Sequence, residues 1–146
     1  MKYQDIGFEK ISLIKNVWEK NRDYHRDISE HFSNDYVGLH FEERMQFLGD
    51  IDKENVKITI AEKNNEVFGY CISCCEAHKG ELLSLHVLES ERSKGIGKEL
   101  SKTHLDWLKS KKCSEIQVVV SQENNNTIRF YKDLGFLANT IQMKLK

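Results

Sequence analysis

The stretch that decides the fold is Glu81–Leu100, which reads ELLSLHVLESERSKGIGKEL. Its first part, residues 82–88, is an apolar run typical of a buried strand, and apolar residues return at helical spacing from Ile96 onward. The polar segment between these two patterns contains Gly95 and Gly97. We therefore expect a strand, a tight loop and a helix in direct succession.

A junction of this kind can bind an anion. The first turn of a helix leaves backbone N–H groups without partners and carries the positive end of the helix dipole. Gly95 and Gly97 let the backbone approach an oxyanion with no side chain in the way. The pair also fits an ordinary strand-to-helix turn. It does not fit a Walker loop, which needs Gly-Lys-Ser/Thr where this chain has Gly97-Lys98-Glu99, and it does not fit a dinucleotide loop, which needs three glycines.

The composition is that of one ordinary globular domain. A chain of 146 residues has room for a single core, and a net charge of -1 argues against a general nucleic-acid binder. No apolar run approaches the roughly 18 residues of a membrane span, and the first residues lack the core of a signal peptide. We therefore expect a cytoplasmic protein that does not bind membranes.

The four cysteines are expected to be free thiols, as is usual in that compartment. Cys71 and Cys74 have a C-x-x-C spacing, but residues three apart on a strand point to opposite faces. No second pair of ligands follows them, so the sequence predicts no metal site.

Hydrophobic periodicity predicts the other elements. Residues 8–25 and 41–48 have helical patterns, and any strand before them, over residues 1–6, must be short. Strand alternation over residues 56–60 and 67–75 predicts a hairpin with its turn at Asn64-Asn65, and Lys79-Gly80 is expected to turn the chain into the next strand.

The last third alternates between strands and a helix. Ile116–Val120 is β-branched throughout and is expected to be a strand buried on both faces. A helix with Phe130 and Tyr131 on one side follows and ends at Gly135, and Leu137–Lys144 has the pattern of a last strand. The result is an α/β fold with a mixed, mostly antiparallel central sheet and helices on both faces.

Two motifs resemble one family. Arg92-Ser93-Lys94-Gly95-Ile96-Gly97 resembles the acyl-CoA pyrophosphate loop of the GNAT superfamily of N-acetyltransferases, with Ser93 in place of a common Gly. Asn124, followed seven residues later by Tyr131 and then by the Leu-Gly-Phe turn at 134–136, is similar to the family's C-terminal signature. The resemblance covers residues 56–146. It implies a single GNAT-type domain over 1–146, with 1–50 as a helical acceptor-side region and 56–146 as the acetyl-CoA-binding core.

The resemblance also implies a cofactor site. Leu85 and Val87 would offer main-chain groups to the pantetheine arm, Asn124 would hydrogen-bond that arm, and Tyr131 would lie beside the thioester sulfur. Backbone N–H groups of the loop would surround the pyrophosphate, and the loop residues are Arg92, Ser93, Lys94, Gly95, Ile96, Gly97 and Lys98. Asn124 also fits a simple helix cap and Tyr131 a core aromatic residue.

Acetyl transfer to an amine needs three catalytic groups. An amine with a pKa of about 10.4 is protonated near neutral pH, so a base must remove a proton. The developing oxyanion needs a donor, for which we expect the Val87 N–H, and the departing thiolate needs an acid, for which we expect Tyr131. Glu81, eleven residues before Arg92 as in the histone-acetyltransferase branch, is the predicted base.

Other bases remain open. Ser84 and His86 lie on the same strand, and a water chain could end at His25 or Glu30. In a regular strand the side chain of Glu81 points to the same face as those of Leu85 and Val87. A bulge between them would place Glu81 on the opposite face.

The sequence therefore predicts an acetyl-CoA-dependent N-acetyltransferase that acts on a primary amine of a small molecule or peptide, by direct attack in a ternary complex. The alternative is a catalytically weak acyl-CoA binding or sensing module that regulates a partner. The acceptor could be held by scattered acids of the N-terminal third or by Trp18, Phe32 and Tyr36. The oligomeric state is open, although an exposed last strand would give a homodimer a way to form.

Overall fold

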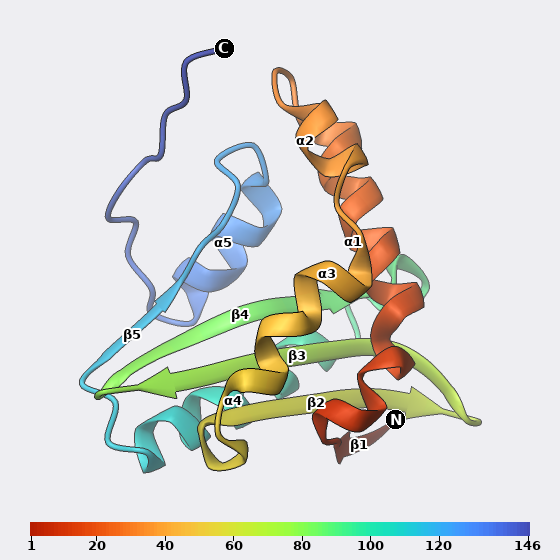
Figure 1. Cartoon of the computed structure of the whole chain (residues 1–146), viewed down its shortest axis with the longest axis vertical. Helices are drawn as coiled ribbons and strands as arrows, with labels where there is room; N and C mark the ends of the chain where they lie inside the picture. Colours follow the sequence, from red (N-terminus) through yellow and green to blue (C-terminus); the bar gives the residue numbers. More distant parts are fainter.

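The computed structural model describes all 146 residues and has one five-stranded sheet in the order β1-β2-β3-β4-β5 (Figure 1). Neighbouring strands are antiparallel except β4 and β5, which are parallel. The strands are β1 (Lys2–Asp5), β2 (Val56–Lys63), β3 (Glu66–Glu76), β4 (Lys79–Val87) and β5 (Glu115–Val118). The predicted α/β architecture, mixed and mostly antiparallel, is confirmed.

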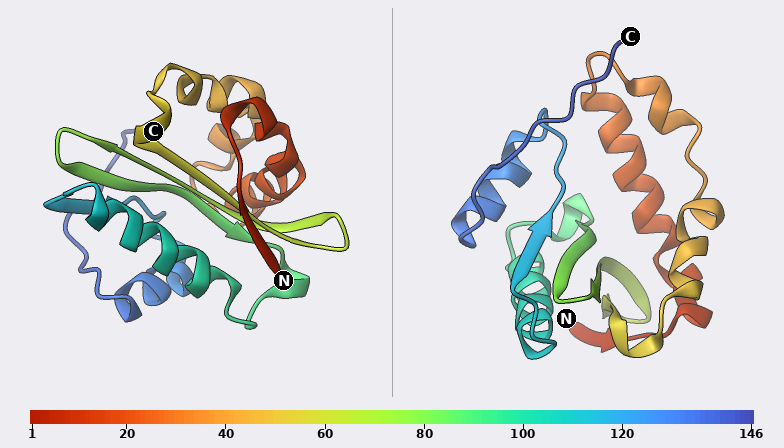
Figure 2. Two further views of the ribbon diagram at one scale, coloured as in Figure 1. Left: turned by 90° about the horizontal axis from the view of Figure 1, so that it is seen from below. Right: turned by 60° about the vertical axis from the view of Figure 1, so that its left-hand side comes forward.

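Helices cover both faces of the sheet (Figure 2). One face carries the N-terminal elements, which are η1 (Phe8–Ile14), α1 (Lys15–Ile28), α2 (Ser33–Val37), α3 (Phe41–Met45) and η2 (Gln46–Asp50). The other face carries α4 (Ile96–Ser110) and α5 (Asn125–Asp133). Two single-turn elements, η3 (Lys53–Asn55) and η4 (Glu89–Glu91), lie before β2 and after β4. No helix combines the length and the apolar character that crossing a membrane requires.

Successive side chains of β3 point to opposite faces of the sheet and contribute to two separate cores. Tyr70 faces the N-terminal helices and packs in a cluster with Ile14, Trp18 and Leu48. Its neighbour Cys71 faces the opposite side, in a cluster that also contains residues of α4 and α5. Both faces of the central strands are therefore buried.

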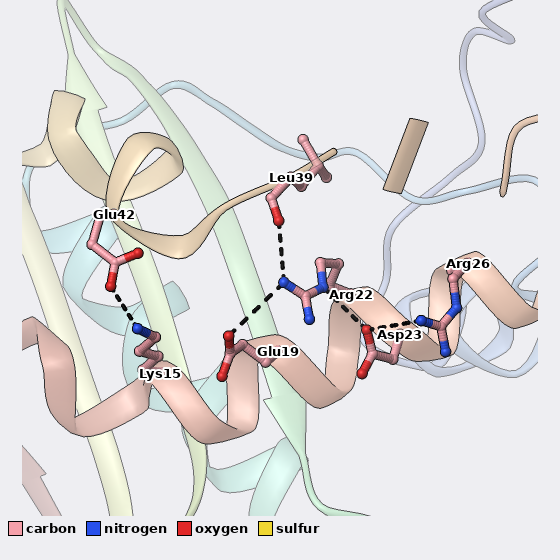
Figure 3. A network of polar contacts seen from close by, with 7 residues as sticks. All are labelled: Lys15, Glu19, Arg22, Asp23, Arg26, Leu39 and Glu42. Carbon is pink, nitrogen blue, oxygen red and sulfur yellow. Dashed lines mark hydrogen bonds and ion pairs between the residues drawn. The ribbon is translucent and has the colours of Figure 1, made fainter. Parts of the chain in front are cut away.

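Polar contacts tie α1 to the segment that follows α2 (Figure 3). A guanidinium nitrogen of Arg22 donates to the Leu39 carbonyl oxygen at 3.1 Å, and Lys15 pairs with Glu42 at 2.6 Å. Exposed ion pairs contribute about 0–1 kcal/mol each, so apolar packing of α1 on the sheet carries most of its stability.

Several sequence expectations are corrected by the structure. The predicted first helix begins as the 3-10 element η1, and a short first strand is present. The turn before β4 uses Ala77 and His78, both with positive φ, rather than Lys79-Gly80. The hairpin turn at Asn64-Asn65 is confirmed, with φ of 54° and 63°.

The two wrong strand predictions concern the edge of the sheet. β5 is not buried on both faces, because it is the edge strand and Glu115, Gln117 and Val119 are exposed. Residues 137–144 form no strand and stay exposed, despite their alternating pattern. In both segments the sequence pattern gives the order of apolar and polar side chains, but it does not show which parts of the chain cover them.

A buried histidine joins α4 to the sheet. The Thr59 hydroxyl donates to an Asp5 carboxylate oxygen at 2.6 Å, so it accepts at 2.8 Å from Nε2 of His104. Nδ1 of His104 then accepts from the Ser73 hydroxyl at 2.6 Å. Burial, helped by the nearby Lys57 ammonium, lowers the pKa of His104 to about 3.

This low pKa predicts a pH-dependent stability. The unfolded chain protonates its histidines near pH 6.5 but folded His104 does not, so stability is complete above that pH and falls as the pH drops toward 3. The expected loss from this one residue between pH 7 and pH 5 is about 2 kcal/mol. In urea unfolding, the difference in the free energy of unfolding between pH 7 and pH 5 should be smaller by that amount in His104→Gln than in the parent chain. His40→Gln, at an exposed site, is the control, and equal pH dependence in all three proteins would contradict the assignment.

The loop before α4 contains one strained residue. Ser93 has a φ of 65° and Gly95 a φ of 81°, both in the left-handed region. A non-glycine residue there costs about 1–2 kcal/mol, and the cost is higher for a β-branched one.

Ser93→Gly should therefore raise the free energy of unfolding, by up to about 1 kcal/mol after the entropy of glycine is included. Ser93→Val should lower it, since the branched side chain fits this conformation poorly. In thermal unfolding, the Tm is expected to be highest for the glycine variant, intermediate for the parent chain with serine, and lowest for the valine variant. A valine variant as stable as the parent chain would show that the loop relaxes out of the left-handed conformation.

Candidate active site

The site lies where β4 and β5 separate. The two strands pair only from Lys79 opposite Glu115 to Leu82 opposite Val118. β4 continues to Val87 without its parallel partner, and a cavity of about 680 Å³ lies between its residues 82–87 and residues 118–121. The loop before α4, the first turn of α4, one side of α5 and one side of α1 complete its lining.

A bulge in β4 decides which side chains face this cavity. Ser73 lies opposite Leu82 and Ile72 opposite Ser84, so Leu83 is an extra residue. Leu82, Leu85 and Val87 consequently face α4, where they belong to one apolar cluster. Glu81 lies on the other face with Ser84 and His86, so of the two arrangements that the sequence left open the structure has the bulged one.

The main-chain groups of Leu85 and Val87 point away from β3. The N–H of Leu88 donates to the Phe68 carbonyl oxygen at 2.8 Å, and hydrogen-bonded pairs alternate along an antiparallel ladder. The pairs of Val87 with Gly69 and of Leu85 with Cys71 are therefore the non-bonded ones. Their N–H and C=O groups face the side where β5 no longer pairs.

The first turn of α4 offers backbone donors to the same cavity. Glu99 N–H makes the first intrahelical bond, to the Gly95 carbonyl oxygen at 2.9 Å. The N–H groups of residues 96–98 therefore have no partner within the helix. Arg92, Ser93 and Gly95 also line the cavity, as do Ile96, Gly97 and Lys98.

Lys94 is the one predicted loop residue that does not line the cavity. Its ammonium pairs with one carboxylate oxygen of Glu91 at 2.9 Å, and Lys63 pairs with the other at 3.0 Å. These hydrogen bonds, from Lys94 first and then Lys63, lower the pKa of Glu91. The only carboxylate in the lining is therefore ionised and balanced by two lysines.

Asn124 connects helices α1 and α5 at the cavity. Its side-chain oxygen accepts from the Thr127 N–H at 3.3 Å, which caps α5, and from the Tyr24 hydroxyl of α1 at 3.4 Å. The guanidinium of Arg92 lies 5.7 Å from the centre of the Tyr24 ring. The cap interpretation of Asn124 is confirmed, and the residue also lines the cavity.

Tyr131 lines the cavity from α5. Its ring is buried in edge contacts with Phe130 and Phe136, with centroids 5.2 Å and 5.5 Å away. Burial, with smaller effects of Cys71 and Tyr70, raises the pKa of Tyr131. The phenol therefore keeps its proton at neutral pH.

Glu81 is not part of the lining. It lies where β4 and β5 still pair, and its carboxylate accepts from the Gln117 side-chain amide at 2.8 Å. Among the sequence-predicted catalytic residues, Val87 and Tyr131 lie at the cavity and Glu81 lies outside it.

Two histidines line the cavity on the side of α1. Burial, and then the charges of Arg92 and His25, lower the pKa of His86 to about 3. Burial also lowers the pKa of His25, whose ring stacks on Tyr36 at 5.6 Å and whose buried Nδ1 has no hydrogen-bond partner. Both rings are neutral at pH 7.

Sequence reasoning did not identify Asn21 and Tyr24 as cavity residues. With His25 they have the i, i+3, i+4 spacing that places side chains on one face of α1. That spacing predicts a shared face, but not that the face covers the cavity. Trp18, considered for an acceptor pocket, is a core residue in edge contact with Phe41 at 5.5 Å.

Comparison with known proteins agrees with this geometry. Residues 17–136 match the family model described as "Acetyltransferase (GNAT) family". No curated protein matches the chain.

Solved structures show the same fold. The PaiA N-acetyltransferase of Thermoplasma acidophilum, solved with coenzyme A, has a TM-score of 0.77 at 20% identity over 97% of this chain and 94% of that one. The BH1408 protein of Bacillus halodurans has a TM-score of 0.77 at 15% identity, over 100% and 99% of the two chains. The aminoglycoside N-acetyltransferase AAC(6')-Iy, also solved with CoA, has a TM-score of 0.68 at 18% identity over 99% and 98%.

At these identities the structural likeness shows the fold alone, whereas the family model covers most of the sequence and both of its motifs. The chain belongs to the GNAT family of acetyltransferases.

Proposed function

We propose that the chain is an acetyl-CoA-dependent N-acetyltransferase that acts on a primary amine of a small molecule or peptide, by direct attack in a ternary complex. The observation that carries this proposal is the meeting of three groups at one cavity. These are the main-chain groups of Leu85 and Val87, the first-turn amides of α4, and the protonated Tyr131. The first two suit an amide-bearing arm and a diphosphate, and the third suits a departing thiolate.

The N-terminal third of the chain, residues 1–50, takes the acceptor side in this proposal, and residues 56–146 hold acetyl-CoA. The pantetheine arm lies along β4 beyond Leu82, in the place that a paired β5 would fill. Its amides meet Leu85, Val87 and Asn124. The diphosphate lies on the amides of residues 95–98, close to the charges of Arg92 and Lys98.

The chemistry then follows from what surrounds the acetyl group. The N–H of Val87 is fixed by the strand and donates to the carbonyl oxygen as it becomes negative. Tyr131 donates its proton to the sulfur as the carbon–sulfur bond breaks. Burial that raises the pKa of the phenol also raises the basicity of a thiolate leaving in the same apolar surroundings.

The base is best placed at His25. Glu81 would need a water chain to reach an amine in the cavity, since its carboxylate lies outside the lining. His25 lines the cavity and its ring is neutral. The imidazole can therefore accept the proton that the amine loses.

The charges of the cavity favour an amine with few positive charges. Its only carboxylate, Glu91, is already paired with two lysines. A polycation would therefore find no free counter-charge there, and would lie close to Arg92. Small monoamines or the amino group of a peptide fit better.

Acetyl-CoA is expected to bind with micromolar affinity and to release free thiol only when an amine is present. Tyr131→Phe should lower turnover about 100-fold, because the acid is lost, while the affinity for acetyl-CoA changes less than about twofold. Isothermal titration and a thiol-release assay over a panel of amines measure the two quantities.

Tyr3→Phe serves as the matched control, since it removes a phenol hydroxyl on β1, outside the cavity lining. Absence of binding at high micromolar acetyl-CoA would overturn the proposal. Tight binding with no amine-dependent thiol release would instead favour an acyl-CoA sensing module.

Substitution of the two candidate bases, His25 and Glu81, should affect kcat differently. His25→Gln should lower kcat about 100-fold near neutral pH with little change in the affinity for acetyl-CoA, and the loss should shrink as the pH is raised and more free amine forms. Glu81→Gln should keep kcat within about twofold. If Glu81→Gln were the variant that lost activity in the pH profile, the base would be Glu81 acting through water.

A further inference from the structure

The side chain of His86 has one nitrogen that the protein leaves unused. The ring lines the cavity and is only 9% exposed. Its Nε2 lies 3.5 Å from a terminal guanidinium nitrogen of Arg92, and because a guanidinium can only donate, Nε2 is the acceptor in this contact. The neutral ring therefore carries its proton on Nδ1. This N–H has no partner in the protein and is not sealed off from solvent, so it is open to the cavity.

Arg92 adds a positive charge beside that N–H. Its Nε donates to the Val87 carbonyl oxygen at 3.0 Å, and its guanidinium carbon lies 5.7 Å from the centre of the Tyr24 ring. These contacts hold the guanidinium between the end of β4 and α1. The only carboxylate of the lining, Glu91, pairs with two lysines instead. Terminal N–H groups of Arg92 are therefore free to donate to a ligand.

Two neighbouring donors, one of them charged, suit a carboxylate. A carboxylate group accepts hydrogen bonds through two oxygens, and its bonds to a guanidinium are among the strongest in proteins. The ring of His86 faces α1, whereas the side chains of Leu85 and Val87 face α4. The carboxylate would therefore lie on the side of the cavity that the proposed function gives to the acceptor.

Resting on that proposed function, we propose that the acceptor is an amino acid with a free carboxylate, and that His86 Nδ1 and the Arg92 guanidinium bind this carboxylate. His25, the proposed base, lines the same side of the cavity. One small molecule can thus place its amine at His25 and its carboxylate at His86. The carboxylate also supplies the negative charge that Arg92 lacks within the protein.

Matched pairs of substrates test the proposal. An amino acid and its carboxamide, such as alanine and alaninamide, share the amine and the side chain and differ in the charge of the carboxyl group. With saturating acetyl-CoA, thiol release should give the amino acid a kcat/KM at least about 10-fold higher than its amide, because a charged hydrogen bond is gained. The amine pKa works against this result, since the amide, with a pKa of about 8, has more free amine at neutral pH.

The panel contains glycine, alanine, leucine, phenylalanine and glutamate, each with its amide, because the side-chain preference is open. Equal values within every pair, or higher values for the amides, overturn the proposal and leave the acetyltransferase reaction in place. Absence of thiol release with every amine overturns the proposed function and this inference with it.

Substitution of His86 tests the role of its N–H. His86→Phe keeps the ring volume, and it should lower kcat/KM for amino acids about 10-fold through KM while changing the value for the amides less than about twofold. His86→Gln should restore part of the loss, because its side-chain amide can donate. His40→Phe, at an exposed site outside the lining, is the control.

The affinity of these variants for acetyl-CoA, measured in parallel, shows that each is folded with its cofactor site intact. A fall in kcat that is equal for amino acids and amides would mean that His86 acts on the acetyl group or in proton transfer. That result overturns the proposal.

Discussion

The site depends on the early end of the pairing between β4 and β5. Parallel strands that stay paired along their length leave no room between them. Here the ladder stops at Leu82 and Val118 while β4 continues to Val87. The remaining half of β4 keeps its bonds to β3 on one side. On the other side its main-chain groups face the cavity, where Arg92 donates to the Val87 carbonyl oxygen. A long amide-bearing ligand can complete that strand, and this one constraint explains why the cavity, the loop and Tyr131 meet at the same place.

Two further features hold the donors in position. The extra residue Leu83 changes the phase of β4, so that Leu85 and Val87 pack toward α4 while Ser84 and His86 face α1. The buried contacts of His104 with Thr59 and Ser73 fix α4 against the sheet and hence fix its first turn at the cavity. Leu83 itself lines the cavity, whereas His104 and its two partners lie outside the lining. Both decide the direction in which the donors point.

The sequence was informative wherever function requires a particular residue at a particular spacing. The glycines of the loop and the pair Asn124 and Tyr131 predicted the strand–loop–helix junction and the family, and these predictions are confirmed by the structure and the family model. It was less informative where a side chain's environment depends on distant elements. The alternation of residues 115–118 and 137–144 was visible, but whether a neighbour covers them is a property of the sheet order. The bulge at Leu83 has no residue signature, and so the face of Glu81 could not be predicted.

The contacts of Arg92 limit which residues around the cavity can be exchanged independently. Its guanidinium donates to the Val87 carbonyl oxygen at 3.0 Å and lies over the ring of Tyr24, which in turn contacts Asn124. Helix α1, one wall of the cavity, is thereby joined to the loop and to the strand that form other walls of it. A substitution on α1 that suits a new amine also disturbs the support of the loop. Under the proposed function, drift in acceptor preference is therefore easiest at Asn21, which lines the cavity without touching Arg92, and most constrained at Tyr24 and at the proposed base His25.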